Sequence, residues 1–387
     1  MHTFYRSRFT WVAYILLSFF GYFLNILGPI TPFLSDELHL SYTVSSFHFT
    51  AFAVGMLVTG LTGDFLIRRA GRVRALWIGA AGMSLGAVLL VFGVNPVMTI
   101  SATFIMGCVG SLILVVVPAA LSDEHQEKSA VAITEANLLS SLINALAPLL
   151  VGWFAYTLFG WRLALILGAL SLLVLFAFLG KSAAPVAKKS DLIPQEGFSL
   201  PFLYWVYWFG LVLAVSVEFC MVFWSAAYME TILGMDKANA AQAVSLFMAG
   251  MIGGRLVSSR LAHTIAPRKM VLGSILLAGV GFFFYWTAAS PWIGMAGLAI
   301  TGLGVACLYP LIISLAIATA EGNTVQASTR ATLASGTAIL ALPLMLGRLA
   351  DLAGLKQAYL LVAGLLAVLM LVVLATSWIA GDASRKD

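Results

Sequence analysis

The chain is organised as long runs of apolar residues separated by short polar loops. A helix needs about 20 mostly apolar residues to cross the hydrocarbon core of a bilayer. Twelve such runs can be delimited, at residues 11–33, 43–66, 74–94, 97–121, 130–155, 161–180, 202–228, 239–260, 270–288, 292–317, 329–350 and 358–380. We therefore predict an all-α membrane protein with twelve transmembrane helices.

The second half of the chain repeats residues of the first half at a spacing of 195 positions. The repeated pairs are Gly55-Met56 with Gly250-Met251, Leu61 with Leu256, Gly107 with Gly302, Pro148 with Pro343 and Gly152 with Gly347, and Glu135 and Arg330 have the same spacing. Two similar helical halves in tandem are typical of alternating-access transporters that are built from parallel repeats. The repeat predicts two pseudo-symmetric six-helix bundles.

One polar stretch divides these halves. Residues 181–200 hold three lysines, two prolines and two acids, whereas the other loops are short. We therefore predict an N-terminal six-helix bundle over residues 1–180, a cytoplasmic linker loop over residues 181–200 and a C-terminal six-helix bundle over residues 201–387.

Composition excludes a soluble protein of this length. The chain is 61% hydrophobic and 10% charged, with a mean hydropathy of +1.01, whereas soluble domains carry about 25% charged residues. The first apolar run is too long for the core of a secretory signal and no small-residue cleavage site follows it, so we expect it to be retained. Cys108, Cys220 and Cys307 all lie within predicted spans, without the spacing of a disulfide framework or a metal site.

The distribution of basic residues predicts the orientation. With the N-terminus in the cytoplasm, four of the 21 Lys and Arg residues fall on the outer side, and the other seventeen fall at or near the cytoplasmic side. Cytoplasmic loops carry such an excess. We expect a multi-pass protein of the inner (cytoplasmic) membrane with both termini in the cytoplasm. The net charge of +5 therefore indicates topology and not nucleic-acid binding.

Several motifs carry a resemblance to a known family. The basic turn "GLTGDFLIRRAGRVRAL" follows the second run, "GGRLVSSRL" stands at the equivalent place in the second half, and Gly160-Trp161-Arg162 opens the sixth run. Together with the 6+6 arrangement and the basic central loop, these resemble the major facilitator superfamily over essentially the whole chain. In the basic turn, Asp64 stands three residues further from the Arg-x-Gly-Arg part than the family signature has it. "GLGVACLYP" and the glutamate of the seventh run are most similar to the fucose-permease-like branch.

The resemblance implies a major facilitator fold. In that fold the two bundles are related by a pseudo-twofold axis along the membrane normal, with a central cavity between them. One bundle rocks against the other during transport. The resemblance thus implies a secondary transporter and no enzymatic activity.

Glu218 is the sharpest candidate for chemistry. It lies about 16 residues into the seventh run, which at about 1.5 Å per residue puts it about 24 Å along the helix. That depth is near the midplane, where such transporters bind substrate. Apolar neighbours favour the neutral form of a carboxyl, and an ionisable group in hydrocarbon is a functional candidate by default. We predict that Glu218 is the proton-coupling site, with a structural glutamate as the alternative.

Other polar and aromatic residues at midspan are predicted to bind the substrate. They are Tyr22, Asn25, Asn137, Asn144, Trp208, Trp224 and Tyr309. Amides, phenols and indoles beside one carboxyl suit a small neutral hydroxylated solute such as a sugar. They suit an amphipathic drug or organic cation about as well, with Glu218 as the counter-charge and Trp224 as a cation–π partner. The aromatic residues also have packing or membrane-interface anchoring as an alternative role.

The family fold implies a gate at the cytoplasmic ends of the helices. There the second predicted span meets the eleventh, and the fifth meets the eighth. The implied pairs across the bundles are Asp64 with Arg330 and Glu135 with Arg255, and the basic turn adds Arg72. Such pairs would close the cytoplasmic side and break when it opens. The alternative is that the basic residues only fix the topology.

Absent motifs narrow the function. No arginine or lysine is expected at midspan, which disfavours an obligate dianionic substrate, and no Walker A or metal-binding pattern is present. We expect no cofactor. The predicted partners are a small-molecule substrate, protons as the coupling ion and the lipid bilayer, with no nucleic acid, and we expect a monomer. Efflux by proton antiport and a non-transporting membrane sensor stay open as alternatives.

Overall fold

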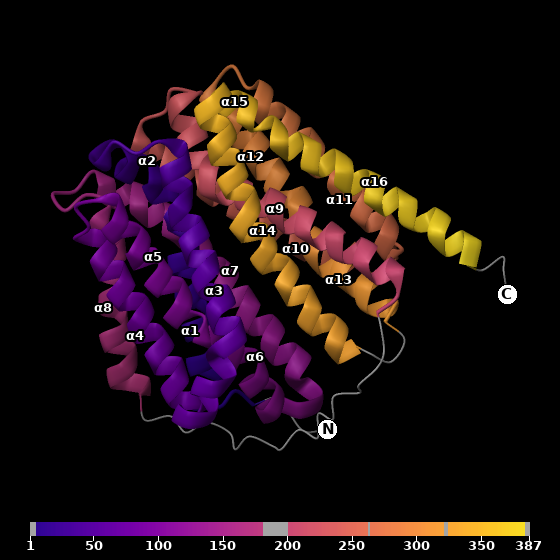
Figure 1. The fold of residues 1–387 in the computed structure, drawn as a ribbon, viewed down its shortest axis with the longest axis horizontal. Helices are drawn as coiled ribbons and strands as arrows, with labels where there is room; N and C mark the ends of the chain where they lie inside the picture. The colour runs from indigo at the N-terminus through magenta and orange to yellow at the C-terminus, as the bar shows by residue number, and fades with distance from the viewer. Residues whose placement is uncertain (1–4, 181–199, 262–263, 321–323, 384–387) are drawn as a thin grey trace. The chain divides into compact units, whose positions relative to one another are not determined.

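The fold is entirely helical over the part of the chain that is described. The computed structural model describes residues 5–180, 200–261, 264–320 and 324–383, while the side chains of Asp64, Arg68 and some residues near the ends of the last long helices lie outside it. Residues 181–199 of the predicted linker are also outside. The elements are α1 (Arg8–Asn25), α2 (Leu27–Leu38), α3 (Tyr42–Ala70), α4 (Arg72–Val91), α5 (Pro96–Gly110), α6 (Leu112–His125), η1 (Gln126–Lys128), α7 (Ser129–Ala155), α8 (Arg162–Leu179), α9 (Phe202–Thr231), α10 (Lys237–Leu261), α11 (Pro267–Thr287), α12 (Pro291–Val305), α13 (Leu308–Ala318), α14 (Thr324–Ala353), α15 (Leu355–Ala358) and α16 (Leu360–Ala383) (Figure 1).

The prediction of a multi-pass helical protein is confirmed. In the described part, eleven helical stretches are long and apolar enough to cross a membrane. One of these, Pro96–Ala155, spans 60 residues and contains two of the predicted segments, 97–121 and 130–155. Its length is sufficient for two crossings, because one crossing needs about 20 residues.

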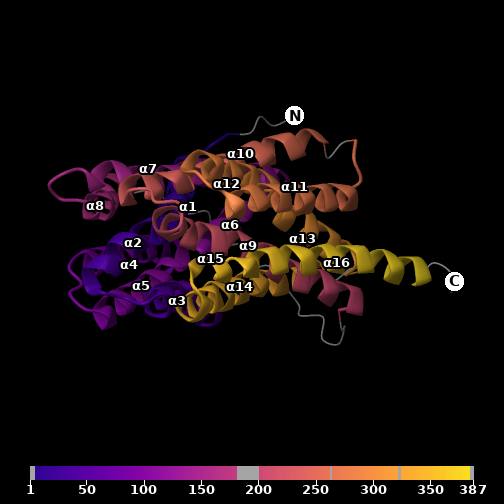
Figure 2. The ribbon, with the colours of Figure 1, turned by 90° about the horizontal axis from the view of Figure 1, so that it is seen from above.

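Contacts divide the chain into two compact units, Met1–Leu192 and Ile193–Asp387. Each unit is a bundle with the same internal plan. In the first, α1 packs on α7, α3 on α5, α4 on α5 and α4 on α8. In the second, the equivalent contacts are α9 on α14, α10 on α12, α11 on α12 and α11 on α16. Figure 2 shows the helices of each bundle from a second direction, by colour. The repeat in the sequence is therefore also a repeat in packing.

Paired glycines make the closest helix contacts in both bundles. A Cβ on Gly55 would meet the backbone of residues 104–108, and one on Gly107 would meet the carbonyl oxygen of Phe52. At the 195-residue spacing, Gly250 faces the backbone of Ala299 and Leu303, and Gly302 faces the carbonyl oxygen of Phe247. Small residues let helix backbones approach in membrane proteins. The repeated glycines therefore set the crossings of α3 with α5 and of α10 with α12.

Several predicted spans are broken where the sequence predicted continuous helices. The segment 11–33 breaks at Ile26, between α1 and α2. The segment 97–121 breaks at Ser111, between α5 and α6, and the segment 292–317 breaks at Ala306 and Cys307, between α12 and α13. The Ser111 hydroxyl donates to the carbonyl of Gly107 at 2.6 Å, and the Cys307 thiol donates to the carbonyl of Gly254 at 3.4 Å. The Ser111 hydroxyl thus bonds to the backbone at its own break, whereas the Cys307 thiol bonds the second break to α10. The apolar pattern reveals neither bond.

Arg162 joins three helix ends in the first bundle. Its guanidinium pairs with Glu37 near the end of α2, at 3.0 and 2.5 Å, and its Nε donates to the carbonyl of Val91 at the end of α4. The indole N–H of Trp161 donates to the same carboxylate at 2.9 Å. A cation at the C-terminus of a helix complements the helix dipole. The Gly-Trp-Arg motif therefore fastens the ends of α2, α4 and α8.

Candidate functional site

Glu218 lies within the apolar helix α9. It is sixteen residues after Phe202, about 24 Å along the helix axis. The residues Val217, Cys220 and Met221 around it are buried, whereas Glu218 itself is half-buried. Among the described residues, no hydrogen-bonding partner contacts its carboxylate directly. A carboxyl without a fixed partner in an apolar helix is able to exchange protons or to accept a ligand hydrogen bond.

Arg255 on α10 is the nearest charged influence on this carboxyl. It is close enough to interact electrostatically with Glu218, although it is exposed and six residues before the end of α10. The family resemblance implied a pair between Arg255 and Glu135, and no basic residue lies near Glu218 along the sequence. The proximity depends on how α9 packs against α10, which the residue pattern does not specify.

Tyr309 connects Glu218 to a second hydroxyl, that of Ser335. Tyr309 on α13 interacts electrostatically with Glu218 and lies within hydrogen-bonding reach of Ser335 on α14. Both residues are half-buried. Tyr309 is thus within electrostatic reach of Glu218, and its predicted contact with substrate stays a prediction. Ser335 was not predicted, since serine is common within membrane helices and carries no signal of its own.

Both predicted tryptophans bond to the backbone of α14. The indole N–H of Trp208 donates to the carbonyl of Arg330 at 2.8 Å. The indole N–H of Trp224 donates to the carbonyl of Pro343 at 3.0 Å, and the Trp224 side chain is fully buried. Trp224 therefore packs inside the second bundle. Its predicted contact with substrate stays a prediction.

The predicted site residues of the first bundle lie on α1 and α7. The Tyr22 hydroxyl donates to the carbonyl of Ala164 at 2.9 Å, and the Asn25 amide donates to the carbonyl of Gly21 at 2.8 Å. Asn144 packs on Gly21, where any Cβ would overlap its amide, and its amide oxygen is buried without a partner among the described residues. Asn144 and Asn25 therefore share one stretch of the α1–α7 contact.

Asn137 is one helical repeat away from Asn144 on α7. It is exposed, and its amide donates to the carbonyl of Ile133 at 2.8 Å. Residues seven apart lie on one face of a helix. Asn137 thus faces the same way as Asn144, and both stay candidates for contact with substrate.

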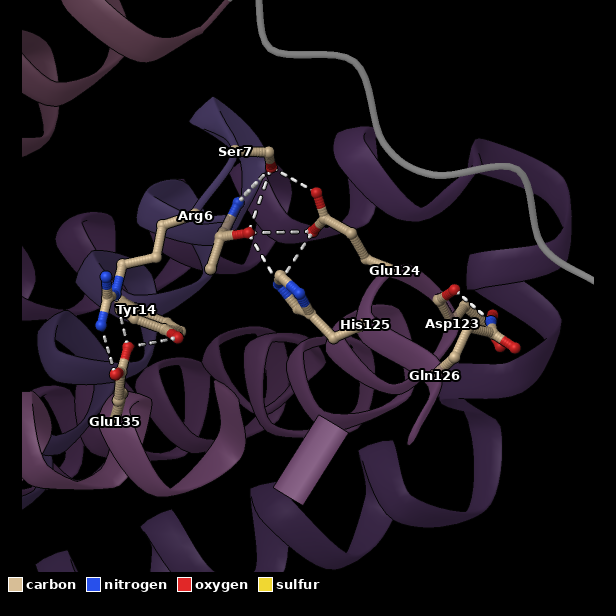
Figure 3. Close-up of polar contacts among 9 residues, drawn as sticks. Arg6, Ser7, Tyr14, Asp123, Glu124, His125, Gln126 and Glu135 are labelled. Atoms are coloured by element: carbon tan, nitrogen blue, oxygen red, sulfur yellow. Dashed lines mark hydrogen bonds and ion pairs between the residues drawn. The ribbon is translucent and has the colours of Figure 1, made fainter. Parts of the chain in front are cut away.

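A polar cluster closes the end of the first bundle where α1 begins (Figure 3). The Arg6 guanidinium donates to both oxygens of Glu135, at 2.7 and 2.5 Å, and the Tyr14 hydroxyl donates to Glu135 at 3.1 Å. The hydrogen bond from Arg6 to Glu135 raises the pKa of the Arg6 guanidinium. Arg6 was not a predicted site residue, and its place two residues before α1 is the only signal that the sequence offered.

The same cluster includes the end of α6. Ser7 caps α1 and donates to Glu124, and the Thr10 hydroxyl lies 3.2 Å from Glu124 and 2.9 Å from the ring of His125. His125 and Glu124 are 3.8 Å apart. The start of α1 is therefore held by α6 as well as by α7.

The remaining residues of the predicted gate are placed as follows. Arg72 at the start of α4 pairs with Asp123 of α6 at 2.5 Å. The guanidinium of Arg330 lies 5.6 Å from the ring centre of Trp205. The side chain of Asp64 falls outside the described residues. The pairing of Asp64 with Arg330 and of Glu135 with Arg255 therefore stays a prediction.

Residues 11–329 match the sequence profile of the Major Facilitator Superfamily. The chain belongs to the Major Facilitator Superfamily. Members of this superfamily are membrane transporters, so transmembrane transport is supported. Among the described residues there is no group of three or more His, Cys, Asp or Glu that could hold a metal ion.

Curated relatives carry the same family name. An uncharacterized MFS-type transporter of Yersinia pestis is 28% identical over 180 residues, which is 45% of this chain and 44% of that protein. The match thus spans less than half of the relative's length. An uncharacterized MFS-type transporter of Bacillus subtilis, YceJ, is 24% identical over 354 residues, covering 85% of this chain and 86% of the relative. The fucose-permease-like branch stays a prediction.

Solved structures show the same fold at low sequence identity. A bacterial homologue of the human lysosomal transporter Spinster, inward-facing and occupied, has a TM-score of 0.81 at 13% identity and covers 97% of this chain and 98% of its own. The nucleoside transporter NupG has a TM-score of 0.74 at 13% identity, covering 95% of this chain and 98% of its own. A D-xylose–proton symporter has a TM-score of 0.73 at 14% identity, covering 96% of each chain. At these identities the likeness shows the fold alone.

Proposed function

We propose that this protein is a secondary active transporter that moves a small neutral hydroxylated solute, such as a sugar, across the inner membrane by alternating access. The proton gradient drives it, and Glu218 carries the proton. The observation that carries this proposal is the position of Glu218, half-buried within apolar α9, with Arg255 in electrostatic reach and no direct partner among the described residues.

The group around Glu218 responds to protonation. When Glu218 is ionised, Arg255 offsets part of the cost of a charge in these apolar surroundings. When Glu218 is protonated, this attraction is lost and the carboxyl becomes a hydrogen-bond donor. One proton therefore changes both the charge and the hydrogen bonding next to Tyr309. Such a change is what couples an ion gradient to substrate affinity.

The donors and acceptors near Glu218 suit a neutral hydroxylated ligand. The hydroxyls of Tyr309 and Ser335 both donate and accept, which matches the hydroxyl groups of a sugar. Solved relatives in fold include transporters of nucleosides and of D-xylose, both hydroxylated solutes. That likeness is consistent with the proposal but assigns no substrate to this chain.

Two observations disfavour efflux of organic cations. Arg255 already attracts the ionised form of Glu218, which weakens that carboxylate as a counter-charge for a cationic drug. The indole of Trp224 is fully buried and bonded to Pro343, so its face is not presented to a cation in this state of the bundle. Proton-antiport efflux therefore ranks second, and a non-transporting sensor third.

The proposal includes an orientation and a gate. Both termini lie in the cytoplasm, the protein acts as a monomer, and the cluster at the start of α1 lies at the cytoplasmic end. When the gate is closed, Glu135 pairs with Arg255 and Asp64 pairs with Arg330, with Arg72 in support. Arg6 already binds Glu135 within its own bundle. Arg6 and Arg255 therefore compete for one carboxylate, and each conformation favours one of the two partners.

The first test is a thermal-shift screen of the purified protein against sugars, polyols and lipophilic cations. A ligand that binds only the folded state raises the melting temperature. Stabilisation by one family of sugars would support the proposal and choose the substrate for flux assays in proteoliposomes. Broad stabilisation by unrelated cations would overturn the substrate class in favour of efflux.

A further inference from the structure

A polar junction lies beside Arg255 in the second bundle. At the break between α12 and α13, the Cys307 thiol donates to the carbonyl of Gly254 on α10 at 3.4 Å. The next carbonyl along α10, that of Arg255, accepts a hydrogen bond from the Ser258 hydroxyl at 3.1 Å. The hydroxyls of Ser258 and of Ser274 on α11 are also within hydrogen-bonding reach of the thiol. We call Cys307, Ser258 and Ser274 the thiol junction.

The thiol junction is packed tightly against α10. Cys307 and Gly254 are both buried. A Cβ on Gly254 would meet the carbonyl oxygen of Leu303 and the Cβ of Ala306, so the backbone of α10 lies directly on the end of α12. Two consecutive carbonyls of α10 are thus bonded here, one from the helix break and one from within α10. The turn that carries Arg255 is therefore anchored to this break.

The charge of Arg255 acts on the thiol junction and on α9. It interacts electrostatically with the Cys307 thiol and with the Glu218 carboxyl. The energy of such an interaction falls with distance. Because the Arg255 side chain is itself exposed, the place at which its backbone is anchored limits the positions that the guanidinium reaches.

The first bundle has an apolar junction at the matching place. Its three residues meet in the same way, since a Cβ on Gly63 would lie 3.7 Å from the Leu112 side chain and a Cβ on Gly79 would lie 3.3 Å from it. At the spacing of 195 residues, the matched pairs are Leu112 with Cys307, Gly63 with Ser258 and Gly79 with Ser274. A helix contact at this place therefore does not require polar residues.

The charges are also confined to the second bundle. Phe23 and Gly60 stand at the positions that match Glu218 and Arg255. The junction is thus polar in the bundle that carries the two charges and apolar in the bundle that lacks both. A role in packing alone does not account for this difference, whereas a role in holding Arg255 does.

We propose that Cys307 is a positioning residue that holds Arg255 on α10 within electrostatic reach of Glu218. Its thiol bonds to the carbonyl of the residue before Arg255, and Ser258 supports it by bonding to the carbonyl of Arg255 itself. This role rests on the proposed function, in which the charge of Arg255 offsets part of the cost of ionising Glu218.

Infrared titration of the Glu218 carboxyl in the purified full-length protein tests this role. The carbonyl stretch of the protonated acid is identified by its loss in Glu218→Gln, and its intensity is followed against pH. A nearby positive charge favours the ionised carboxylate, so Arg255→Gln should move the midpoint upward by about one pH unit. Cys307→Ala should move it in the same direction by a smaller amount. Cys307→Ser, which retains a donor, should restore the wild-type midpoint.

A double variant and a second thiol separate positioning from packing. In the Arg255→Gln background, Cys307→Ala should cause no further shift, because the charge that Cys307 positions is absent. Tyr309, which also interacts with Glu218, is unchanged in every variant. Cys108→Ala is the matched control, since this thiol lies on α5 of the first bundle and its loss should leave the midpoint in place.

Three results would overturn the role of Cys307. An unchanged midpoint in Cys307→Ala, or an equal shift with and without Arg255, would show that the thiol does not act through Arg255. An unchanged midpoint in Arg255→Gln would remove the interaction that Cys307 is proposed to support. If Cys307→Ala does not fold, Ser258→Ala is judged by the same criteria. The infrared band reports ionisation and not transport, so uphill transport by Glu218→Gln would refute the proposed function without deciding this test.

Discussion

The guanidinium of Arg6 binds the carboxylate of Glu135 through two hydrogen bonds, of 2.7 and 2.5 Å, across 129 residues of sequence. Arg6 precedes α1 and Glu135 lies on α7, so the pair fastens the residues before α1 to another helix of the first bundle (Figure 3). Both side chains are partly exposed, at 42% and 29%. Salt screens such pairs.

We predict that this pair limits opening of the first turn of α1. In Arg6→Gln and in Glu135→Gln, amide hydrogen exchange at the start of α1 should become faster, and the double variant should be no faster than either single one. Arg162→Gln is the control, since Arg162 pairs with Glu37 near the end of α2 and not with the start of α1. Additive effects of the two substitutions would show that Arg6 and Glu135 do not act as a pair.

The second prediction concerns proton coupling. In proteoliposomes, Glu218→Gln should abolish uphill transport and remove the pH dependence of flux, because glutamine cannot load or release a proton. Exchange of substrate at equal concentrations should persist. The control is Glu230→Gln, on the same helix, whose carboxylate lies 3.9 Å from Lys237. If Glu218→Gln accumulates substrate as well as the wild type with an unchanged pH profile, Glu218 is not the proton carrier.

The third prediction separates the two roles of Arg255. If Arg255 acts through Glu218, the double variant Glu218→Gln/Arg255→Gln should transport no more slowly than Glu218→Gln alone. If Arg255 also closes the gate, Glu135→Gln and Arg255→Gln should each shift the balance between inward- and outward-facing states, measured by cysteine accessibility. Arg260→Gln, five residues further along α10, is the matched control. An unchanged balance and rate in Glu135→Gln and Arg255→Gln would remove this pair from the gate.

The fourth prediction concerns the glycine crossings. Gly107→Ala and Gly302→Ala each place a methyl group against a carbonyl oxygen of the facing helix. Overpacking of this kind costs about 1–3 kcal/mol, so we expect a lower melting temperature for both variants and to a similar degree. Gly273→Ala and Gly364→Ala are controls, since no atom lies within 4 Å of a Cβ at either position. Equal stability in all four variants would show that the crossings tolerate a side chain.

Much of the helical fold could be predicted from the sequence, because the membrane imposes a simple rule. A segment that crosses lipid must be apolar along its length and must satisfy its backbone internally, so the runs of apolar residues predicted the helices. The spacing of 195 residues predicted that the halves are alike, and Gly107 and Gly302 now give a physical reason for part of that repeat. A glycine at such a position lets the two backbones touch.

The surroundings of Glu218 and Glu135 were less predictable. The partners of Glu135 are Arg6 and Tyr14, which lie more than a hundred residues away, before and within α1. Nothing in a local pattern specifies which basic residue reaches a given acid. The pairing of Glu135 with Arg255 was therefore predicted from the resemblance to the family. In the same way, the proximity of Arg255 to Glu218 follows from the packing of α9 on α10 and not from spacing.

The paired glycines have a mechanical consequence. Where Gly55 and Gly107 bring α3 and α5 into backbone contact, no side chain lies between the helices that could change its rotamer, and the same holds for Gly250 and Gly302. Because backbone meets backbone at these positions, the two helices of a pair cannot shift against each other by a change of side-chain rotamer. We therefore expect each helix pair to move as one unit. A helix break follows this contact at a matched position in each bundle, at Ser111 after Gly107 and at Ala306 after Gly302.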